Sequence, residues 1–290
     1  MTIRNPIVAG SFYEASPADC LRHAEQLIAE AAVPDALPNA LCGGIVPHAG
    51  WVYSGRLAAM TFKALAAVGN ATAFVLFGAD HTGAVAQGEV YYRGSWRTPV
   101  GDLEVDEDLA RAFMAASPAL RANPEAHHSE HSLEVQLPIL KVLCPQARIV
   151  PIAVPPTAMA LDVGRAVGRV LTGRSDVYVV GSTDLTHHGG GRFPAPGGRG
   201  EKGAKWTAAN DRRMIELMEA MSAERIVPEA DARSNACGAG AIAATVAACR
   251  KMGATRGVCL AYTNSYEIVH AADPADPDDT TVGYASVVFA

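Results

Sequence analysis

The sequence predicts an α/β fold: a single three-layer domain over residues 1–290, with a central mixed sheet flanked by helices. Continuous apolar runs, such as residues 72–78 and 176–182, are typical of strands buried on both faces of a sheet. Segments with helical spacing separate these runs, as they do in βα units. No internal repeat and no Pro/Gly-rich linker divides the chain, so we expect one domain.

The predicted elements follow from the apolar pattern and from turn residues. The first strand opens at Ala40 and ends at Pro47–His48. A helix follows from Ser54 to about Val68, because Ser54 is a good N-cap residue. The remaining predictions are strands at 72–78, 148–154, 176–182, 256–264 and 282–290, a polar β-hairpin at 88–106, helices at 106–116, 129–143, 161–171, 206–222 and 238–251, and a mobile Gly/Pro-rich loop at 189–204.

Composition limits the classes of partner. The 49% hydrophobic content supports a large core, and the net charge of −6 without a Lys/Arg cluster argues against nucleic acid or an anionic membrane as the main partner. No segment has the roughly 18 continuous apolar residues of a membrane-spanning helix, and the first residues lack the apolar stretch of a signal peptide. Six scattered cysteines without CxxC spacing indicate free thiols in a reducing cytoplasm.

Polar side chains follow several of the predicted strands. His48 lies in P-H-A-G after the first strand, and His81 lies in G-A-D-H-T-G after the second. In open α/β sheets, ligands bind outside the carboxyl ends of the strands. We therefore expect both imidazoles at one rim of the sheet, although each alone is also consistent with a histidine bonded to a nearby carbonyl.

The same rim is expected to receive a carboxylate, a third imidazole and a thiol. Asp184 and His187 form D-x-x-H after the strand at 176–182, which suits a general base and the group that orients it. Cys237 precedes a predicted helix, where a thiol has a lowered pKa. The alternatives are a turn cap for Asp184 and a small buried apolar residue for Cys237. His188 is expected at the surface or on a pocket wall.

The stretch H-H-S-E-H-S-L-E-V-Q-L-P (127–138) resembles a helical metal site, because His131 and Glu134 are three residues apart. It is not the HExxH motif of zinc proteases, which spaces its two histidines by four. Glu130 with His131 either caps the predicted helix or orders the pocket from behind the ligands. We favour the second interpretation.

Together these motifs resemble the Memo family, protein B of the AmmeMemoRadiSam system. The matching segments are AGSFYEASPADC, IVPHAGWVYSG, LFGADHTG, EHSLEVQLP, IVPIAV, GSTDLTHHG, CGAG, YTNSYE and VGYASVVF. Memo proteins resemble class III extradiol (LigB-type) non-haem iron dioxygenases in fold. The resemblance implies metal ligands at His48, His81 and Cys237, with Asp184 and His187 alongside. Asp80 departs from the usual G-P-[SN]-H pattern and adds a carboxylate beside His81.

The resemblance implies a metal-dependent redox enzyme that uses iron or copper, in which His187, oriented by Asp184, moves protons. Trp51 and Tyr53 would wall the pocket, and the 189–204 loop would act as a lid. Two alternatives stay open: an adaptor that binds a peptide or another partner without chemistry, and a zinc hydrolase. By family resemblance, AMMECR1-like and radical SAM proteins are candidate partners, beside an unknown small molecule or peptide.

Overall fold

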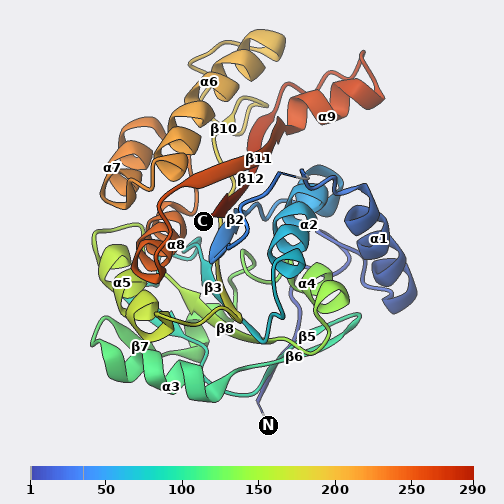
Figure 1. Cartoon of the computed structure of the whole chain (residues 1–290). Helices are drawn as coiled ribbons and strands as arrows, with labels where there is room; N and C mark the ends of the chain where they lie inside the picture. The colour runs from blue at the N-terminus through green and yellow to red at the C-terminus, as the bar shows by residue number, and fades with distance from the viewer. Residues whose placement is uncertain (1, 35) are drawn as a thin grey trace.

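The computed structural model describes residues 2–34 and 36–290, and it confirms an α/β fold with a central mixed sheet between helices (Figure 1). In the described residues the helices are α1 Pro17–Glu30, α2 Trp51–Ala67, α3 Glu107–Ala116, η1 Pro124–His127 (3-10), α4 Leu137–Leu143, α5 Met159–Leu171, α6 Gly200–Glu219, α7 Ala223–Arg233, α8 Ala239–Met252 and α9 Ser265–Ala272. The strands are β1 Ile3–Arg4, β2 Gly43–Val46, β3 Ala73–Gly78, β4 Gly88–Val90, β5 Ser95–Thr98, β6 Gly101–Glu104, β7 Leu120–Ala122, β8 Arg148–Ala153, β9 Val177–Ser182, β10 His187–His188, β11 Gly257–Asn264 and β12 Thr281–Phe289.

The main sheet has nine strands in the order β10-β12-β2-β9-β3-β8-β4-β7, with β11 also paired to β12. The four strands β2, β9, β3 and β8 are parallel, so their carboxyl ends share one edge. β12 is antiparallel to β2, and β4 is antiparallel to β8, which makes the sheet mixed. The predicted strand-end residues therefore have a common rim at which to meet.

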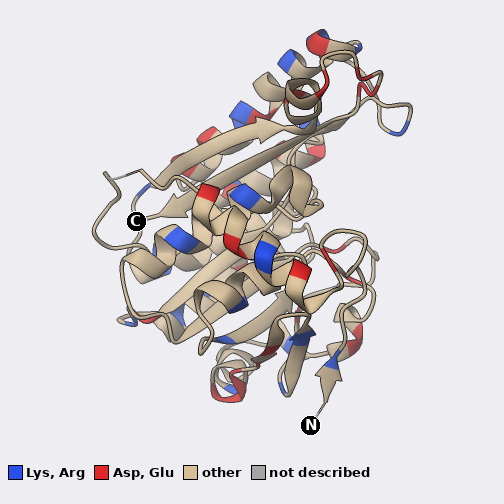
Figure 2. Ribbon diagram, turned by 90° about the vertical axis from the view of Figure 1, so that its right-hand side faces the viewer, with Lys and Arg blue, Asp and Glu red and all other residues tan. Residues whose placement is uncertain are grey.

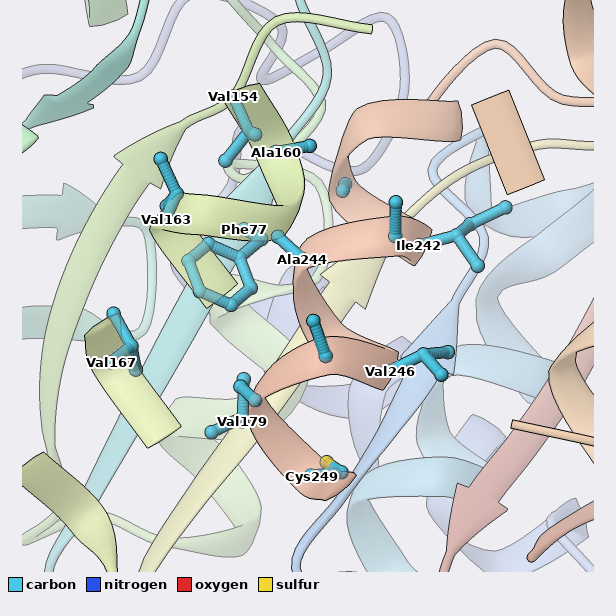
Figure 3. Packing of buried hydrophobic residues seen from close by; sticks show 14 of the residues in the cluster. Phe77, Val154, Ala160, Val163, Val167, Val179, Ile242, Ala244, Val246 and Cys249 are labelled. Atoms are coloured by element: carbon cyan, nitrogen blue, oxygen red, sulfur yellow. The ribbon is translucent and has the colours of Figure 1, made fainter. Parts of the chain in front are cut away.

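The strands are buried on both faces because they are apolar throughout. In β3, Val75 and Phe77 belong to one core cluster with α5 and α8, whereas Phe74 and Leu76 belong to a second cluster with α2 and α4. This alternation follows from the period of two along a strand. Figure 1 shows α5 and α8 on one side of the sheet and α2 and α4 on the other, and Figure 3 shows Phe77 of β3 packed beside side chains of α5 and α8.

The predicted hairpin at 88–106 divides between two sheets. β5 and β6 pair antiparallel and join β1 in a separate three-stranded sheet. β4 instead joins the main sheet beside β8. The elements β1, α1, β7, η1, β10, α7 and α9 lie outside the segments for which the sequence predicted a helix or a strand.

Three predicted boundaries are wrong. α2 begins at Trp51 after Gly50, and the Ser54 hydroxyl donates to the Ala49 carbonyl from inside the first turn. The helix expected at 129–143 exists only from Leu137, because Pro138 lacks the N–H that a helix interior needs and is tolerated in the first turn. The Gly-rich loop ends earlier than expected, since α6 begins at Gly200.

Charged residues cover the outside without forming a single-sign field. Figure 2 shows Lys and Arg interspersed with Asp and Glu along the outer helices. Across the described part of the chain, no helix is both long and apolar enough to span a membrane.

Candidate metal centre

His48, His81 and Cys237 meet at the carboxyl edge of the parallel strands. His48 follows β2, His81 follows β3, and Cys237 lies directly before the N-terminal end of α8. Cys237 Sγ is 3.2 Å from His48 Nε2, and the two imidazole rings are 5.1 Å apart. One ligand atom from each of the three side chains lies within 4.8 Å of the others, which is a group that can hold a metal ion.

A buried hydrogen-bond network fixes the tautomer of His48. Ser182 Oγ, at the end of β9, donates to the Ser132 carbonyl at 2.7 Å and accepts from Gln136 Nε2 at 2.9 Å. The remaining lone pair of this hydroxyl can only accept, so His48 Nδ1, 2.8 Å away, must donate to it. In the neutral imidazole His48 Nε2 is then unprotonated, and it is the atom that faces Cys237. Burial lowers the pKa of His48, which also favours the neutral imidazole.

Glu130 fixes His81 in the same way. Its carboxylate accepts from His81 Nδ1 at 2.9 Å and from the His81 backbone N–H at 2.8 Å, and it also accepts from the Ser132 N–H. A carboxylate behind a histidine orients the ring and leaves Nε2 for a metal. Burial by itself lowers the pKa of His81, but hydrogen bonds to Cys237 and Glu130 raise it to about 10. The carboxyl of Glu130 has a lowered pKa, since those hydrogen bonds outweigh the effect of burial.

The thiol of Cys237 has a lowered pKa, which favours the thiolate. Burial alone would raise the pKa of its thiol, but charge and hydrogen bonding from His48 and His81 lower it to about 6. The Asp184 backbone N–H also donates to Sγ at 3.2 Å. A thiolate and an unprotonated Nε2 that face each other require a cation between them, either a proton or a metal ion. The donor set therefore fits a metal ion.

Asp184 and His187 lie beside this group. Each is hydrogen-bonded to a backbone group and not, as expected, to the other. Asp184 Oδ1 accepts from the His48 backbone N–H at 2.8 Å, and burial raises the pKa of the carboxyl. His187 Nδ1 is 3.1 Å from the Leu185 carbonyl and donates to it. Asp184 thus positions the backbone of a predicted ligand, and a backbone carbonyl orients His187.

The centre opens into a cavity of about 440 Å³, which we call the ligand cavity. It is lined by Phe12, His48, Ala49, Gly50, Tyr53, His81, His131, Asp184, His187, Arg192, Phe193, Ser265, Val269, Asp278, Thr280, Val282 and Tyr284. His131 stacks on His81 with ring centroids 4.8 Å apart, and His81, Glu130 and His131 form a second group that can hold a metal. Tyr53 lies on the wall of this cavity.

Three other predicted pocket residues point elsewhere. Trp51 is buried in the core, where it stacks on Tyr13 and donates to the Val135 carbonyl. Asp80 accepts from the backbone of the 82–85 turn, so its carboxylate closes that turn instead of joining the ligands. His188 is neither at the surface nor on the wall of the ligand cavity, because it is fully buried and its ring lies against Trp206.

Sequence reasoning missed several residues of the site. Among them, Ser182 and Gln136 fix His48, and Arg192 and Phe193 line the ligand cavity. Ser182 carried a usable signal, since it ends an apolar strand as the residues before His48 and His81 do. The others lie in irregular segments, and nothing in the local pattern marks them.

Comparisons with known proteins show the family of the chain. The chain matches the family described as Memo-like protein over residues 4–288. It is similar to MEMO1 family proteins of Methanopyrus kandleri (34% identity, 99% of this chain and 98% of the relative), Methanothermobacter thermautotrophicus (35%, 98% and 99%) and Caldivirga maquilingensis (32%, 100% and 99%). The chain belongs to the Memo family. The predicted resemblance is thereby confirmed over nearly the whole length.

Proposed function

We propose that this Memo family member is a metal-dependent oxidoreductase that holds iron or copper on His48, His81 and Cys237. The observation that supports the proposal is the donor set, in which one nitrogen of each imidazole and the sulfur of Cys237 lie within 4.8 Å of one another. Imidazole and thiolate donors suit iron, copper and zinc. When bound, iron or copper supplies one-electron redox chemistry.

The chain's own residues would perform three tasks around that ion. Ser182 and Glu130 hold the two imidazoles in the tautomer that ligation needs. Asp184 fixes the backbone at His48. His187 donates from Nδ1 to a carbonyl, so its Nε2 keeps a lone pair with which to accept a proton from a substrate in the ligand cavity.

The test is metal analysis of anaerobically purified protein. We expect one equivalent of iron or copper in the wild type, loss of metal in His48→Ala, His81→Ala and Cys237→Ser, and retention in His187→Ala. Each variant should keep the far-ultraviolet circular dichroism of the wild type. Full metal content in any of the three ligand variants removes that residue from the centre, and metal loss in His187→Ala makes His187 a ligand.

A second measurement separates redox chemistry from the alternatives. Reduced, metal-loaded protein should consume O₂ or change its spectrum with nitric oxide, because three protein ligands leave open positions. A protein that purifies with zinc alone and responds to neither gas would instead be a hydrolase or an adaptor. Once a substrate is known, His187→Ala should lower the rate by roughly 10²–10⁴-fold, the usual contribution of a positioned acid/base group.

A further inference from the structure

A second cavity of about 620 Å³ adjoins the ligand cavity, and we call it the ring cavity. His187 and Phe193 line both cavities, so these two side chains form the partition between them. Cys237 lines the ring cavity, whereas His48 and His81 line the ligand cavity. The candidate metal centre therefore lies between two hollows, each of a size that takes a small molecule.

The walls of the ring cavity are mainly apolar and include aromatic and proline rings. Phe193 and Trp206 are half-buried, and Pro194 and Pro196 are exposed to solvent. Apolar side chains left facing water around a concave site mark a place where a ligand binds. Flat side chains favour a flat partner, because rings pack well face to edge or in offset stacks.

The charges of the lining favour a neutral group. Away from the metal centre, where Cys237 and His187 line the cavity, Asp231 and Arg233 are its Asp, Glu, Lys or Arg side chains, one of each sign, and both are exposed. A site that selected an anion or a cation would carry an excess of the opposite charge. The apolar walls are thus the main source of selectivity.

The far wall of the ring cavity is built before any ligand arrives. Asn210 Nδ2 donates to the Arg233 carbonyl at 3.0 Å and to Thr186 Oγ1 at 2.9 Å. Asn235, which is fully buried, donates to the Asn210 carbonyl at 3.0 Å. These bonds tie the segment after α7 to the residue before His187. A preformed wall saves the cost of ordering it on binding.

We propose that the ring cavity binds a planar, uncharged ring of the substrate while the reacting group lies at the metal centre. The proposal rests on the proposed function for the reaction and adds the substrate class: an extended molecule with an aromatic or fused-ring substituent.

The experiment uses zinc-loaded protein, which is redox-inert, and two neutral probes of similar size, 2-naphthalenemethanol and its saturated analogue decahydronaphthalene-2-methanol. Nuclear magnetic resonance titration should show the naphthalene probe binding at least tenfold more tightly than the saturated one. The indole N–H resonance of Trp206, assigned from its loss in Trp206→Phe, should shift, while those of the buried Trp51 and Trp96 stay in place.

Two variants locate the site. Ala230→Phe fills the cavity from α7, and Pro196→Asp places a charge on its exposed rim, and each should weaken naphthalene binding by tenfold or more. Ala115→Phe, the same substitution at an exposed position of α3, should leave it unchanged. Equal affinity for both probes, no binding at millimolar concentration, or unchanged binding in both cavity variants overturns the proposal. The proposed function is tested separately, by the iron or copper content of the anaerobically purified wild type and its ligand variants.

Discussion

At the scale of single residues, the metal centre depends on hydrogen bonds made to the imidazole nitrogens that face away from the centre. Ser182 and Glu130 each occupy Nδ1 of one imidazole, so both rings offer Nε2 to the same point. The thiolate of Cys237 needs no base of its own, since the imidazoles lower its pKa. The ligands are thus prepared for a cation by residues that would not touch it.

The thiolate makes Cys237 reactive at an unusually low pH. In metal-free protein, alkylation by iodoacetamide should reach half its maximal rate near pH 6, because the pKa of Cys237 is lowered to about 6. Mass spectrometry of the modified peptides measures this. Cys259, whose burial raises its pKa to about 11, is the internal control and should react slowly through the neutral range. His81→Gln should move the midpoint upward, and a wild-type midpoint near the ordinary thiol value would contradict the thiolate assignment.

Glu130 and Asp80 test which carboxylate supports the metal. Glu130→Gln should weaken metal affinity by about 10–100-fold, the usual effect of removing a partner behind a ligating histidine, with full loading still reached at saturating metal. Asp80→Asn should leave the affinity unchanged, because Asp80 bonds only to its own turn. Competition with a chromogenic chelator gives both constants. Equal effects of the two substitutions would mean that Asp80 acts on the metal after all.

At the scale of elements, the sequence predicted strands and their ends better than it predicted irregular segments. The rim that gathers His48, His81 and Cys237 follows from apolar runs and from parallel pairing, both of which are local patterns. The 129–136 segment follows from distant contacts: the Glu134 carboxylate accepts from the backbone N–H groups of Ile7 and Val8 and from Arg4. Those partners lie more than 120 residues away, so periodicity could not reveal them.

The packing of α5 on α8 depends on residues without side chains. A Cβ at Gly164 would collide with the backbone carbonyl oxygen of Ala244, so the two helices approach as closely as they do only through glycine. Gly164→Ala should therefore lower the free energy of unfolding by about 1–3 kcal/mol despite the better helix propensity of alanine. Urea denaturation measures the change. Arg165→Ala, on the exposed face of α5, should change it by less than about 1 kcal/mol, and a stabilising Gly164→Ala would show that the helices can move apart.

At the scale of the whole molecule, α6 packs against the edge of the main sheet that β10, β11 and β12 form. Asp211 of α6 lies fully buried where these parts meet, accepting from the Thr186 backbone N–H and the Tyr262 hydroxyl, each at 2.8 Å. Its Oδ2 lies against Gly283 of β12, where a Cβ would not fit. No sequence motif marks this contact, since its members come from four parts of the chain that only the complete fold brings together.

Burial raises the pKa of Asp211 from 3.8 to about 7, and its hydrogen bonds to Thr186 and Tyr262 only partly oppose that rise. The folded state therefore keeps a proton that the unfolded chain loses above about pH 4. The resulting stabilisation is fully present below the unfolded pKa, and it is lost as the pH rises through the folded pKa near 7. Stability from this group thus falls with rising pH over the range from about 4 to 7.

Asp211→Asn mimics the protonated carboxyl and should remove this dependence. The free energy of unfolding of the variant, minus that of the wild type, should rise by roughly 2–3 kcal/mol between pH 5 and pH 8, as measured by urea denaturation at each pH. Tyr262→Phe is the matched control: it removes one hydrogen bond but keeps the buried carboxyl, so its stability should still fall with pH as the wild type does. A difference between Asp211→Asn and wild type that stays constant with pH would show that the carboxyl is ionised throughout, and that Asp211 holds α6 against the sheet edge as a charged group.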